Sequence, residues 1–275
     1  MKIETIFMVV LLATLSITII SLRLLIPFLA SRKMGQKILE IGPRWHKSKE
    51  GTPTMGGLGF IFAIIVVFFG FLILAKENLD KTQLLCSLNI IVYSLLNAMI
   101  GIIDDFAKLR KAKNEGLTPL SKFILQAIVA VLFLVSLHFT IGINTRLYLP
   151  FIDVSVELGF IYYILAFFIL CGVVNSVNLT DGIDGLAASI VATVGLFFAI
   201  INFLIVKDYI IAFFSASLIG GMLGFLTYNF YPAKVFMGDT GSLFLGGLIV
   251  SMSFLIDNIL LVLIYGLYLY VKQAQ

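Results

Sequence analysis

Residues 56–75 read GGLGFIFAIIVVFFGFLILA and contain no charged side chain. A helix needs about 20 apolar residues to cross the hydrocarbon core of a bilayer, so this stretch alone predicts a membrane-spanning helix. The rest of the chain agrees: of its 275 residues 60% are hydrophobic and 12% are charged, with a mean hydropathy of +1.09. Soluble domains carry about 25% charged residues, so the composition excludes that class and indicates a polytopic membrane protein.

Further apolar runs of similar length follow along the chain. The predicted spans are residues 4–29, 56–75, 83–103, 120–140, 158–174, 185–206, 209–226, 241–256 and 258–272. The first run is too long for the core of a signal peptide and has no small-residue cleavage pattern. Only helices and closed barrels satisfy their backbone in lipid, and these runs are too long for strands. We therefore predict an all-α bundle of about nine helices in one domain, residues 1–275, with a small hairpin within 141–157.

Positive charges gather in alternate loops between the predicted spans. The segment 30–55 carries six Lys or Arg residues and 104–119 carries four, whereas the intervening loops carry only one or two. Short loops rich in Lys and Arg stay in the cytoplasm. The pattern predicts a multi-pass protein whose N-terminus lies outside and whose basic loops face the cytoplasm.

Carboxylates, amides and glycines fall in the loops predicted to be cytoplasmic. They are Asp104, Asp105, Asn175, Asn178, Asp181, Asp184, Asn229 and Asp239, with GTPTMGG (51–57), DGIDG (181–185) and MGDTGS (237–242). Several carboxylates on one surface suit Mg²⁺, which prefers one or two carboxylates together with phosphate oxygens. Glycine lets a ligand approach the backbone, and the start of a helix offers free N–H groups to an anion. These features favour a metal and phosphate site on one membrane face.

Each motif also has an ordinary structural explanation. Asp104 and Asp105 could end a helix, with Lys108 pairing to Asp104 at the i,i+4 spacing. Asp239 or Thr240 could cap the helix that begins at MGDTGS, and GTPTMGG could be a plain turn into the second helix. Because acidic residues recur at several predicted helix ends, we favour the metal site over these explanations.

Two other features concern polar residues next to these motifs. Residues 175–185 read NSVNLTDGIDG, which predicts a helix end followed by a turn, beside a nucleotide or sugar. Lys122 and Gln126 lie four positions apart near the inner end of the fourth span. A charge inside a span is a functional hypothesis by default, although Lys122 could also extend its ammonium group to the membrane surface.

Four motifs in order carry a family resemblance: GTPTMGG (51–57), DDFAK (104–108), NSVNLTDGIDGLA (175–187) and NFYPAKVFMGDTGSLFLGG (229–247). They resemble the polyprenyl-phosphate N-acetylhexosamine-1-phosphate transferases, over about residues 30 to 250. The resemblance implies a Mg²⁺-dependent enzyme of the bacterial inner membrane, a homodimer with a cytoplasmic active site and no nucleic-acid partner. The GTPTMGG form is similar to the branch that moves phospho-N-acetylmuramoyl-pentapeptide from uridine diphosphate (UDP) onto undecaprenyl phosphate, giving lipid I and uridine monophosphate (UMP).

The same resemblance implies roles for individual residues. Asp239 would be the Mg²⁺ ligand, and Asp104 and Asp105 would be the catalytic pair, with Asp104 the better candidate to take a proton from the lipid phosphate. Lys108 would orient or neutralise phosphate. The implied substrate-binding residues are Asn178, Asp181 and Asp184 on the nucleotide side, Asn229 near the phosphates or uracil, Lys122 near the pyrophosphate or lipid phosphate, and Thr52 in GTPTMGG.

One departure and several alternatives accompany this resemblance. Family members have ten spans and a histidine-rich motif after the ninth, whereas this sequence stops after the predicted ninth span, and neither His46 nor His138 can replace the motif. We therefore expect weak substrate binding or slow turnover. The rivals are a sibling transferase that uses N-acetylglucosamine phosphate, a non-catalytic scaffold, and a cation-coupled transporter, whose carboxylates would lie near the bilayer midplane. Direct attack and a covalent aspartyl intermediate are both open as mechanisms.

Overall fold

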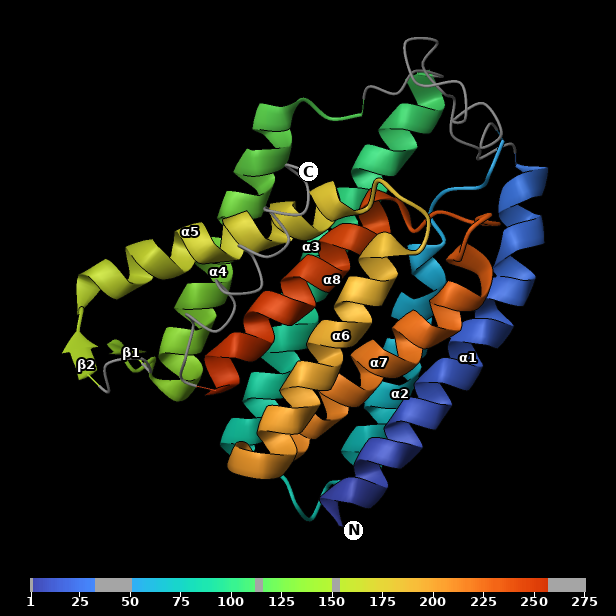
Figure 1. Cartoon of the computed structure of the whole chain (residues 1–275). Helices are drawn as coiled ribbons and strands as arrows, with labels where there is room; N and C mark the ends of the chain where they lie inside the picture. Colours follow the sequence, from blue (N-terminus) through green and yellow to red (C-terminus); the bar gives the residue numbers. More distant parts are fainter. Residues whose placement is uncertain (1, 33–50, 112–115, 150–153, 257–275) are drawn as a thin grey trace.

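The structure, a computed structural model, describes residues 2–32, 51–111, 116–149 and 154–256. These residues form a bundle of α-helices with one two-stranded antiparallel hairpin (Figure 1). The helices are α1 (Ile3–Ser31), α2 (Gly57–Leu74), α3 (Lys81–Lys111), α4 (Pro119–Ile141), α5 (Phe160–Thr180), α6 (Leu186–Ile201), α7 (Tyr209–Asn229) and α8 (Gly238–Ser253). The strands are β1 (Arg146–Leu149) and β2 (Val154–Glu157), and short π and 3₁₀ turns follow α6 (Asn202–Val206) and α8 (Phe254–Ile256).

The helices confirm a polytopic membrane protein. Within the described residues, 7 helices are long and apolar enough to cross a membrane, and they match the first seven predicted spans. The eighth predicted span, 241–256, corresponds to α8 and its 3₁₀ turn. The ninth, 258–272, lies outside the described residues.

Helix α8 occupies the centre of the bundle. Every residue from Thr240 to Ser253 is buried, and α8 packs against α3 and α5 on two sides (Figure 1). Its 16 residues span about 24 Å, somewhat less than the hydrocarbon core. The helix that begins at MGDTGS is therefore surrounded by protein rather than by lipid.

Helix α3 continues beyond the predicted span 83–103, which corrects one expectation. Asp104 and Asp105 were expected in a loop, but they lie on α3, which runs on to Lys111. The cause is local: residues 104–111 read DDFAKLRK, which are mostly good helix formers with no Gly or Pro to end the helix. The predicted helix end and turn within 175–185 are confirmed, because α5 ends at Thr180.

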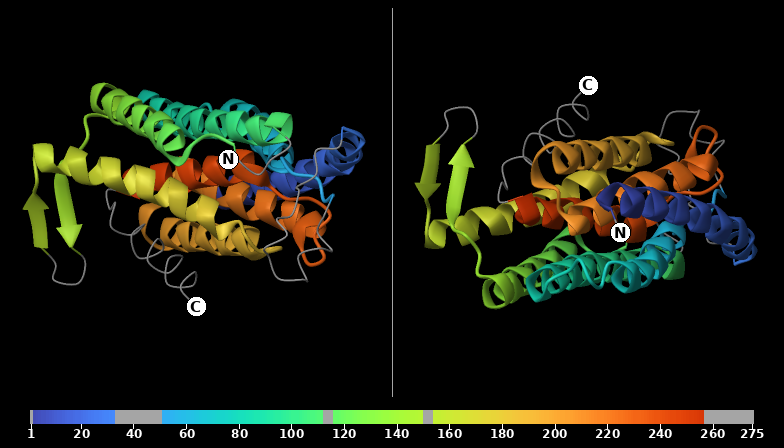
Figure 2. Two further views of the ribbon diagram at one scale, coloured as in Figure 1. Left: turned by 90° about the horizontal axis from the view of Figure 1, so that it is seen from above. Right: turned by 90° about the horizontal axis from the view of Figure 1, so that it is seen from below.

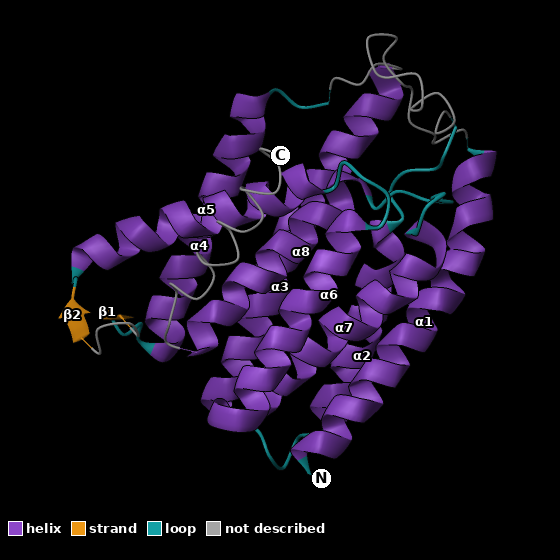
Figure 3. Cartoon of the chain, viewed as in Figure 1, coloured by secondary structure: helices purple, strands orange, loops and turns teal. Residues whose placement is uncertain are grey.

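Three loops meet at one end of the bundle, which we call the loop end (Figure 3). They are 51–56 before α2, 181–185 between α5 and α6, and 230–237 between α7 and α8. Backbone hydrogen bonds join the first and the last: the Phe236 N–H donates to the Pro53 carbonyl at 2.8 Å, and the Gly56 N–H donates to the Phe236 carbonyl at 2.8 Å. GTPTMGG is thus a turn into α2 that is also paired with the segment leading into α8.

The hairpin predicted within 141–157 is confirmed. Arg146 lies opposite Glu157 in the register of β1 and β2, and the Arg146 Nε atom is 3.0 Å from the Glu157 carboxylate. Helix α5 leaves the bundle at an angle, and the hairpin at its start projects to one side (Figure 2). The hairpin is therefore far from the loop end.

Helices α1 and α7 approach each other closely through small residues. A Cβ atom on Gly220 would lie 2.3 Å from the Leu11 carbonyl oxygen, and one on Gly224 would lie 2.8 Å from the Thr18 Cβ. Burial of apolar surface does not drive helix association in lipid, so close backbone packing of this kind contributes much of the stability.

Gly220→Ala is expected to destabilise the protein by about 1–3 kcal/mol, because the new methyl group forces the α1 and α7 backbones apart. Gly172→Ala on α5 is the matched control, since a Cβ there meets nothing within 4 Å. Thermal unfolding in detergent should give a lower midpoint for Gly220→Ala only. Equal midpoints for the two variants would contradict the close α1–α7 packing.

Candidate active site

Side chains from α3, α4, α5 and α8 meet at the loop end, and we call them the carboxylate cluster. They are Asp104, Asp105 and Lys108 from α3, Lys122 from α4, Asn178 from α5 and Asp239 from α8. Each belongs to one of the motifs or features that the sequence singled out. The fold thus brings together residues that lie up to 135 positions apart in the chain.

Asp239 is the centre of this cluster. Its Oδ2 atom accepts hydrogen bonds from the Lys108 Nζ at 2.9 Å and the Lys122 Nζ at 2.8 Å. Its Oδ1 atom accepts one from the Asn178 Nδ2 at 2.9 Å, and the Lys122 Nζ also donates to the Asn178 Oδ1 at 3.0 Å. The side chain of Asp239 lies in the first turn of α8 and caps no N–H group of that helix. The carboxylate is therefore directed at neighbouring helices.

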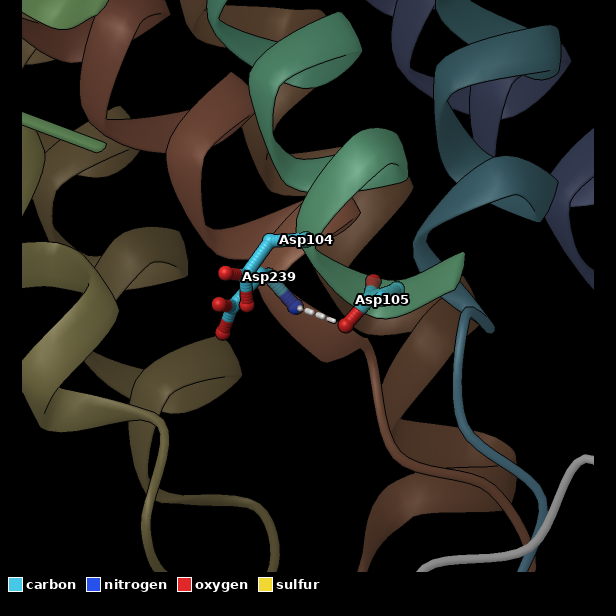
Figure 4. A group of neighbouring side chains, drawn as sticks. All are labelled: Asp104, Asp105 and Asp239. Carbon is cyan, nitrogen blue, oxygen red and sulfur yellow. Dashed lines mark hydrogen bonds between the residues drawn. The ribbon is translucent and has the colours of Figure 1, made fainter. Parts of the chain in front are cut away.

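Asp104 faces Asp239 from α3 (Figure 4). It is 3% exposed, its Oδ2 atom lies 2.7 Å from the Lys108 Nζ, and its Oδ1 atom accepts a hydrogen bond from the Leu117 N–H at 2.7 Å. The predicted i,i+4 pair is thereby confirmed. A Cβ on Gly116 would lie 2.5 Å from Asp104 Oδ1, so the segment before α4 fits closely over this carboxylate only because residue 116 is glycine.

Asp105 points away from Asp104, towards the backbone of α8 (Figure 4). It accepts hydrogen bonds from the Asp239 N–H at 3.2 Å, from the Thr240 N–H at 2.9 Å and from the Thr240 hydroxyl at 2.7 Å. These N–H groups are the free donors that the sequence assigned to a ligand anion. The first turn of α8 is instead capped by a carboxylate from another helix, and neither Asp239 nor Thr240 supplies the cap.

The three aspartates fit a divalent metal ion. One carboxylate oxygen from each of Asp104, Asp105 and Asp239 lies within 4.8 Å of the others. Oxygen-only ligands of this kind suit hard cations. Asp104 and Asp239 are the better ligands, because they face each other, whereas both oxygens of Asp105 accept hydrogen bonds from the first turn of α8. The ammonium groups of Lys108 and Lys122 both contact the Asp239 carboxylate, and Lys108 also contacts Asp104.

Asn229 and Asp184 hold the loops at this end in place. The Asn229 Oδ1 accepts from the Gly185 N–H at 3.0 Å, and its Nδ2 donates to the Val235 carbonyl at 2.9 Å. Asp184 accepts from the Ala233 N–H at 3.1 Å. These contacts join loop 181–185 to loop 230–237, so both residues shape the surface beside the carboxylate cluster.

Asp181 follows the last residue of α5 and lies near the cluster. Burial raises the pKa of this carboxyl well above its usual range, and the negative charges of Asp239 and Asp105 raise it further, against the opposing effect of Lys108. Thr52, the remaining predicted substrate residue, is partly buried, and its side chain makes no hydrogen bond within the described part of the chain. The carboxylate cluster therefore includes the predicted residues of α3, α4, α5 and α8, whereas Asp181, Asp184, Asn229 and Thr52 lie outside it.

Two hydroxyl residues of the site were not predicted. Ser242 accepts a hydrogen bond from the Asn178 Nδ2 at 2.7 Å, and Thr240 donates to Asp105. Both lie in the quoted motif MGDTGS. The spacing of three from Asp239 to Ser242 places the two on one helix face, so the sequence did contain a signal for Ser242.

Comparison with known proteins places this geometry in a family. Residues 87–257 match the family model described as glycosyl transferase family 4. The chain is 40% identical over 259 residues to the phospho-N-acetylmuramoyl-pentapeptide-transferase of Listeria monocytogenes, covering 94% of this chain and 78% of that protein. It is 41% identical over 253 residues to the protein of that name from Oceanobacillus iheyensis, covering 92% and 76%.

A third relative gives the same result. The phospho-N-acetylmuramoyl-pentapeptide-transferase of Caldanaerobacter subterraneus is 41% identical over 263 residues, which cover 96% of this chain and 79% of that protein. The region that matches the family model contains all six residues of the carboxylate cluster. The chain therefore belongs to glycosyl transferase family 4, and within it to the phospho-N-acetylmuramoyl-pentapeptide-transferases (MraY).

Proposed function

We propose that the protein transfers phospho-N-acetylmuramoyl-pentapeptide from its UDP carrier to undecaprenyl phosphate, giving lipid I and UMP. The observation that carries this proposal is the cluster in which Asp104, Lys108, Lys122 and Asp239 converge. It occurs in a chain about two-fifths identical to transferases named for this group. Both substrates carry phosphate, and such transfers depend mainly on positioning and charge neutralisation.

Lys108 and Lys122 are the groups that would meet the phosphates. Both ammonium groups donate to the same oxygen, Asp239 Oδ2, at 2.9 and 2.8 Å. Each ammonium group has three donors, so each can keep one contact to the protein and offer others to phosphate oxygens. The two lysines come from α3 and α4, and a diphosphate between them would be held from two sides.

Asp104 is the proposed proton acceptor for the lipid phosphate, or the group that orients it. Leu117 N–H and Lys108 hold its carboxylate at 2.7 Å each. Asp105 has a different role in this proposal: it anchors the first turn of α8 and thereby positions Asp239. Asn178 hydrogen-bonds to both Asp239 and Lys122 and thereby fixes their relative positions. The geometry is compatible with direct attack and with an aspartyl intermediate.

The proposed metal is Mg²⁺, held by Asp239 together with Asp104. When bound, it would neutralise the negative charge of the diphosphate during transfer. Asp181, Asp184 and Asn229 are proposed to border the nucleotide, and Thr52 is proposed to lie at the edge of the substrate site.

The loop end is proposed to face the cytoplasm of a bacterium, with the N-terminus outside. Helix α1 begins at the opposite end of the bundle and ends at Ser31 near the loop end, and the sequence that follows Ser31 is rich in Lys and Arg. Lys and Arg in short loops favour the cytoplasmic side. A soluble nucleotide donor and a lipid acceptor would meet at that surface. A homodimer remains part of the proposal, on the family resemblance alone.

The rival functions fit the structure less well. A cation-coupled transporter would place its carboxylates near the bilayer midplane, whereas Asp239 lies in the first turn of α8 and Asp104 and Asp105 lie about two turns before the end of α3. A scaffold would not need two lysines converging on one carboxylate oxygen. The sibling transferase differs in the donor sugar and would use the same cluster.

Release of UMP from the purified protein tests the proposal directly. With undecaprenyl phosphate, Mg²⁺ and UDP-N-acetylmuramoyl-pentapeptide, we expect UMP and lipid I to form in equal amounts. UDP-N-acetylglucosamine should give none, and UMP from that donor instead would establish the sibling activity. No UMP from either donor would contradict a transferase.

A further inference from the structure

A second polar pair joins α4 to α5 one helical turn away from the carboxylate cluster. The Asn175 Nδ2 donates to the Gln126 Oε1 at 2.7 Å. Gln126 lies four residues after Lys122 on α4, and Asn175 lies three residues before Asn178 on α5. Gln126 therefore lies on the same face of α4 as Lys122, and Asn175 lies on the same face of α5 as Asn178. The Gln126–Asn175 contact repeats the Lys122–Asn178 contact one turn further into the bundle.

The stability of the fold does not account for this pair. Gln126 is 2% exposed, and its Nε2 atom has no hydrogen-bond partner among the described residues. Asn175 is only half-buried, and its Nδ2 also donates to the Cys171 carbonyl at 2.8 Å, so replacing Gln126 leaves one of its two N–H donors without this partner and keeps the other paired. A half-satisfied buried amide is less favourable than an apolar side chain of similar shape. An apolar residue at position 126 would therefore serve packing at least as well.

The pair does bear on the position of Lys122. The Lys122 side chain is 14% exposed, and its Nζ must reach Asp239 on α8 and Asn178 on α5 at the same time. Because the lysine chain is long and flexible, the distance between the α4 and α5 backbones decides whether both contacts form. The nearest side-chain hydrogen bond between those two helices is that of Gln126 and Asn175.

We propose that Gln126 and Asn175 are positioning residues that hold Lys122 on Asp239 and Asn178. The effect of the pair on the position of Lys122 does not depend on catalysis, and only its effect on the rate rests on the proposed function. When the pair is broken, the Lys122 ammonium group should move away from Asp239 Oδ2 and become accessible to solvent, while Lys108 keeps its contact with that oxygen. Transfer should then slow, because a phosphate contact is misplaced.

Gln126→Met is the test variant, since it keeps the length of the side chain and removes the acceptor for Asn175. Ser136→Ala is the matched control: it removes a side-chain hydrogen bond from the same helix, to Asn89 on α3, towards the opposite end of α4. We expect Lys122 in Gln126→Met to be acylated several times faster by an amine reagent, measured by mass spectrometry. The thermal midpoint should be unchanged or higher. Ser136→Ala should leave the acylation of Lys122 unchanged.

Kinetics provide the second readout. We expect kcat to fall about tenfold in Gln126→Met with little change in KM for the UDP donor, as for a misplaced catalytic contact. Adding Asn175→Ala should cause no further loss, because both changes break the same pair. Unchanged acylation of Lys122 in Gln126→Met would overturn the inference. A wild-type protein that releases no UMP would overturn the proposed function instead, and the acylation rates would still decide the inference.

Discussion

Asp239→Asn is expected to lower kcat by about a thousandfold while leaving the fold intact. Asparagine keeps the size of the side chain and one oxygen, but it removes the negative charge on which both lysines converge. Lys108 and Lys122 contact Oδ2 at 2.9 and 2.8 Å, and in the variant they would meet at most a neutral carbonyl oxygen there. The proposed metal would lose its first ligand at the same time. Two parts of the site therefore fail together, which is why we expect this single change to have a very large effect.

The backbone contacts of Asp239 explain why the fold should survive. Its N–H donates to Asp105, and that bond does not involve the side chain. Thr240 also keeps both of its bonds to Asp105, so the first turn of α8 remains capped. The thermal midpoint of Asp239→Asn should accordingly stay near that of the wild type.

UMP release over a range of Mg²⁺ concentrations measures this prediction, and Mn²⁺ binding followed by electron paramagnetic resonance provides a readout without turnover. Glu157→Gln is the control, because it removes one carboxylate from the exposed hairpin far from the loop end. We expect the control to keep the activity and the metal dependence of the wild type. If Asp239→Asn kept an unaltered Mg²⁺ dependence, Asp239 would not be the metal ligand.

The sequence predicted which segments meet, and it failed on the direction of side chains. The order of the motifs and the one-sided placement of polar residues were enough to expect Asp104 and Asp239 in one site. The family resemblance implied Asp104 and Asp105 as a catalytic pair, and the sequence placed both of them in a loop. On a helix, adjacent side chains point about 100° apart, so the two carboxylates have different neighbours: Asp104 faces Asp239, and Asp105 bonds to the first turn of α8. Only the continuation of α3 to Lys111 reveals this.

Asn229 shows a different limit of the sequence. Its position before a conspicuous motif indicated a polar residue of the site, and it does lie at the loop end. Which atoms an amide contacts depends on where two distant loops run, and here they are the Gly185 N–H and the Val235 carbonyl. No spacing in the sequence encodes such a contact, because loop 181–185 and loop 230–237 come together only after α6 and α7 have packed.

The first turn of α8 owes its position to several neighbours that are distant in sequence. Asp105 caps it from α3, and the Gly57 N–H on α2 donates to the Met237 carbonyl at 3.0 Å. A Cβ on Gly57 would lie 2.4 Å from the Gly241 Cα, and one on Gly101 would lie 2.3 Å from the Asp239 carbonyl oxygen. The first turn of α8 is thus held between two glycines, Gly57 on α2 and Gly101 on α3, and the placement of the Asp239 carboxylate depends on this backbone packing.

Gly101→Ala should therefore damage both the fold and the site. The new methyl group would lie 2.3 Å from the Asp239 carbonyl oxygen and 2.5 Å from the Thr240 nitrogen. These are backbone atoms, so no side-chain rotation can relieve the clash, and α3 and α8 must separate. The overpacking should cost about 1–3 kcal/mol or more of stability. The same shift moves Asp239 away from Asp104 and Lys108, and a displacement of about 1 Å can cost a hundredfold in rate.

Gly172→Ala separates this effect from the general consequence of adding a methyl group to a membrane helix, because a Cβ at Gly172 meets nothing within 4 Å. In Gly101→Ala both the thermal midpoint and the kcat of the folded fraction should fall. In Gly172→Ala both should stay at the wild-type values. Loss of stability with normal kcat would mean that α8 can shift without moving Asp239, which would contradict the dependence of the carboxylate on this contact. Normal values of both would show that α3 and α8 are not in such close contact. We expect a low kcat at temperatures below the unfolding transition, together with weaker Mn²⁺ binding. That result would show that Gly101 positions the metal site through the backbone of α8.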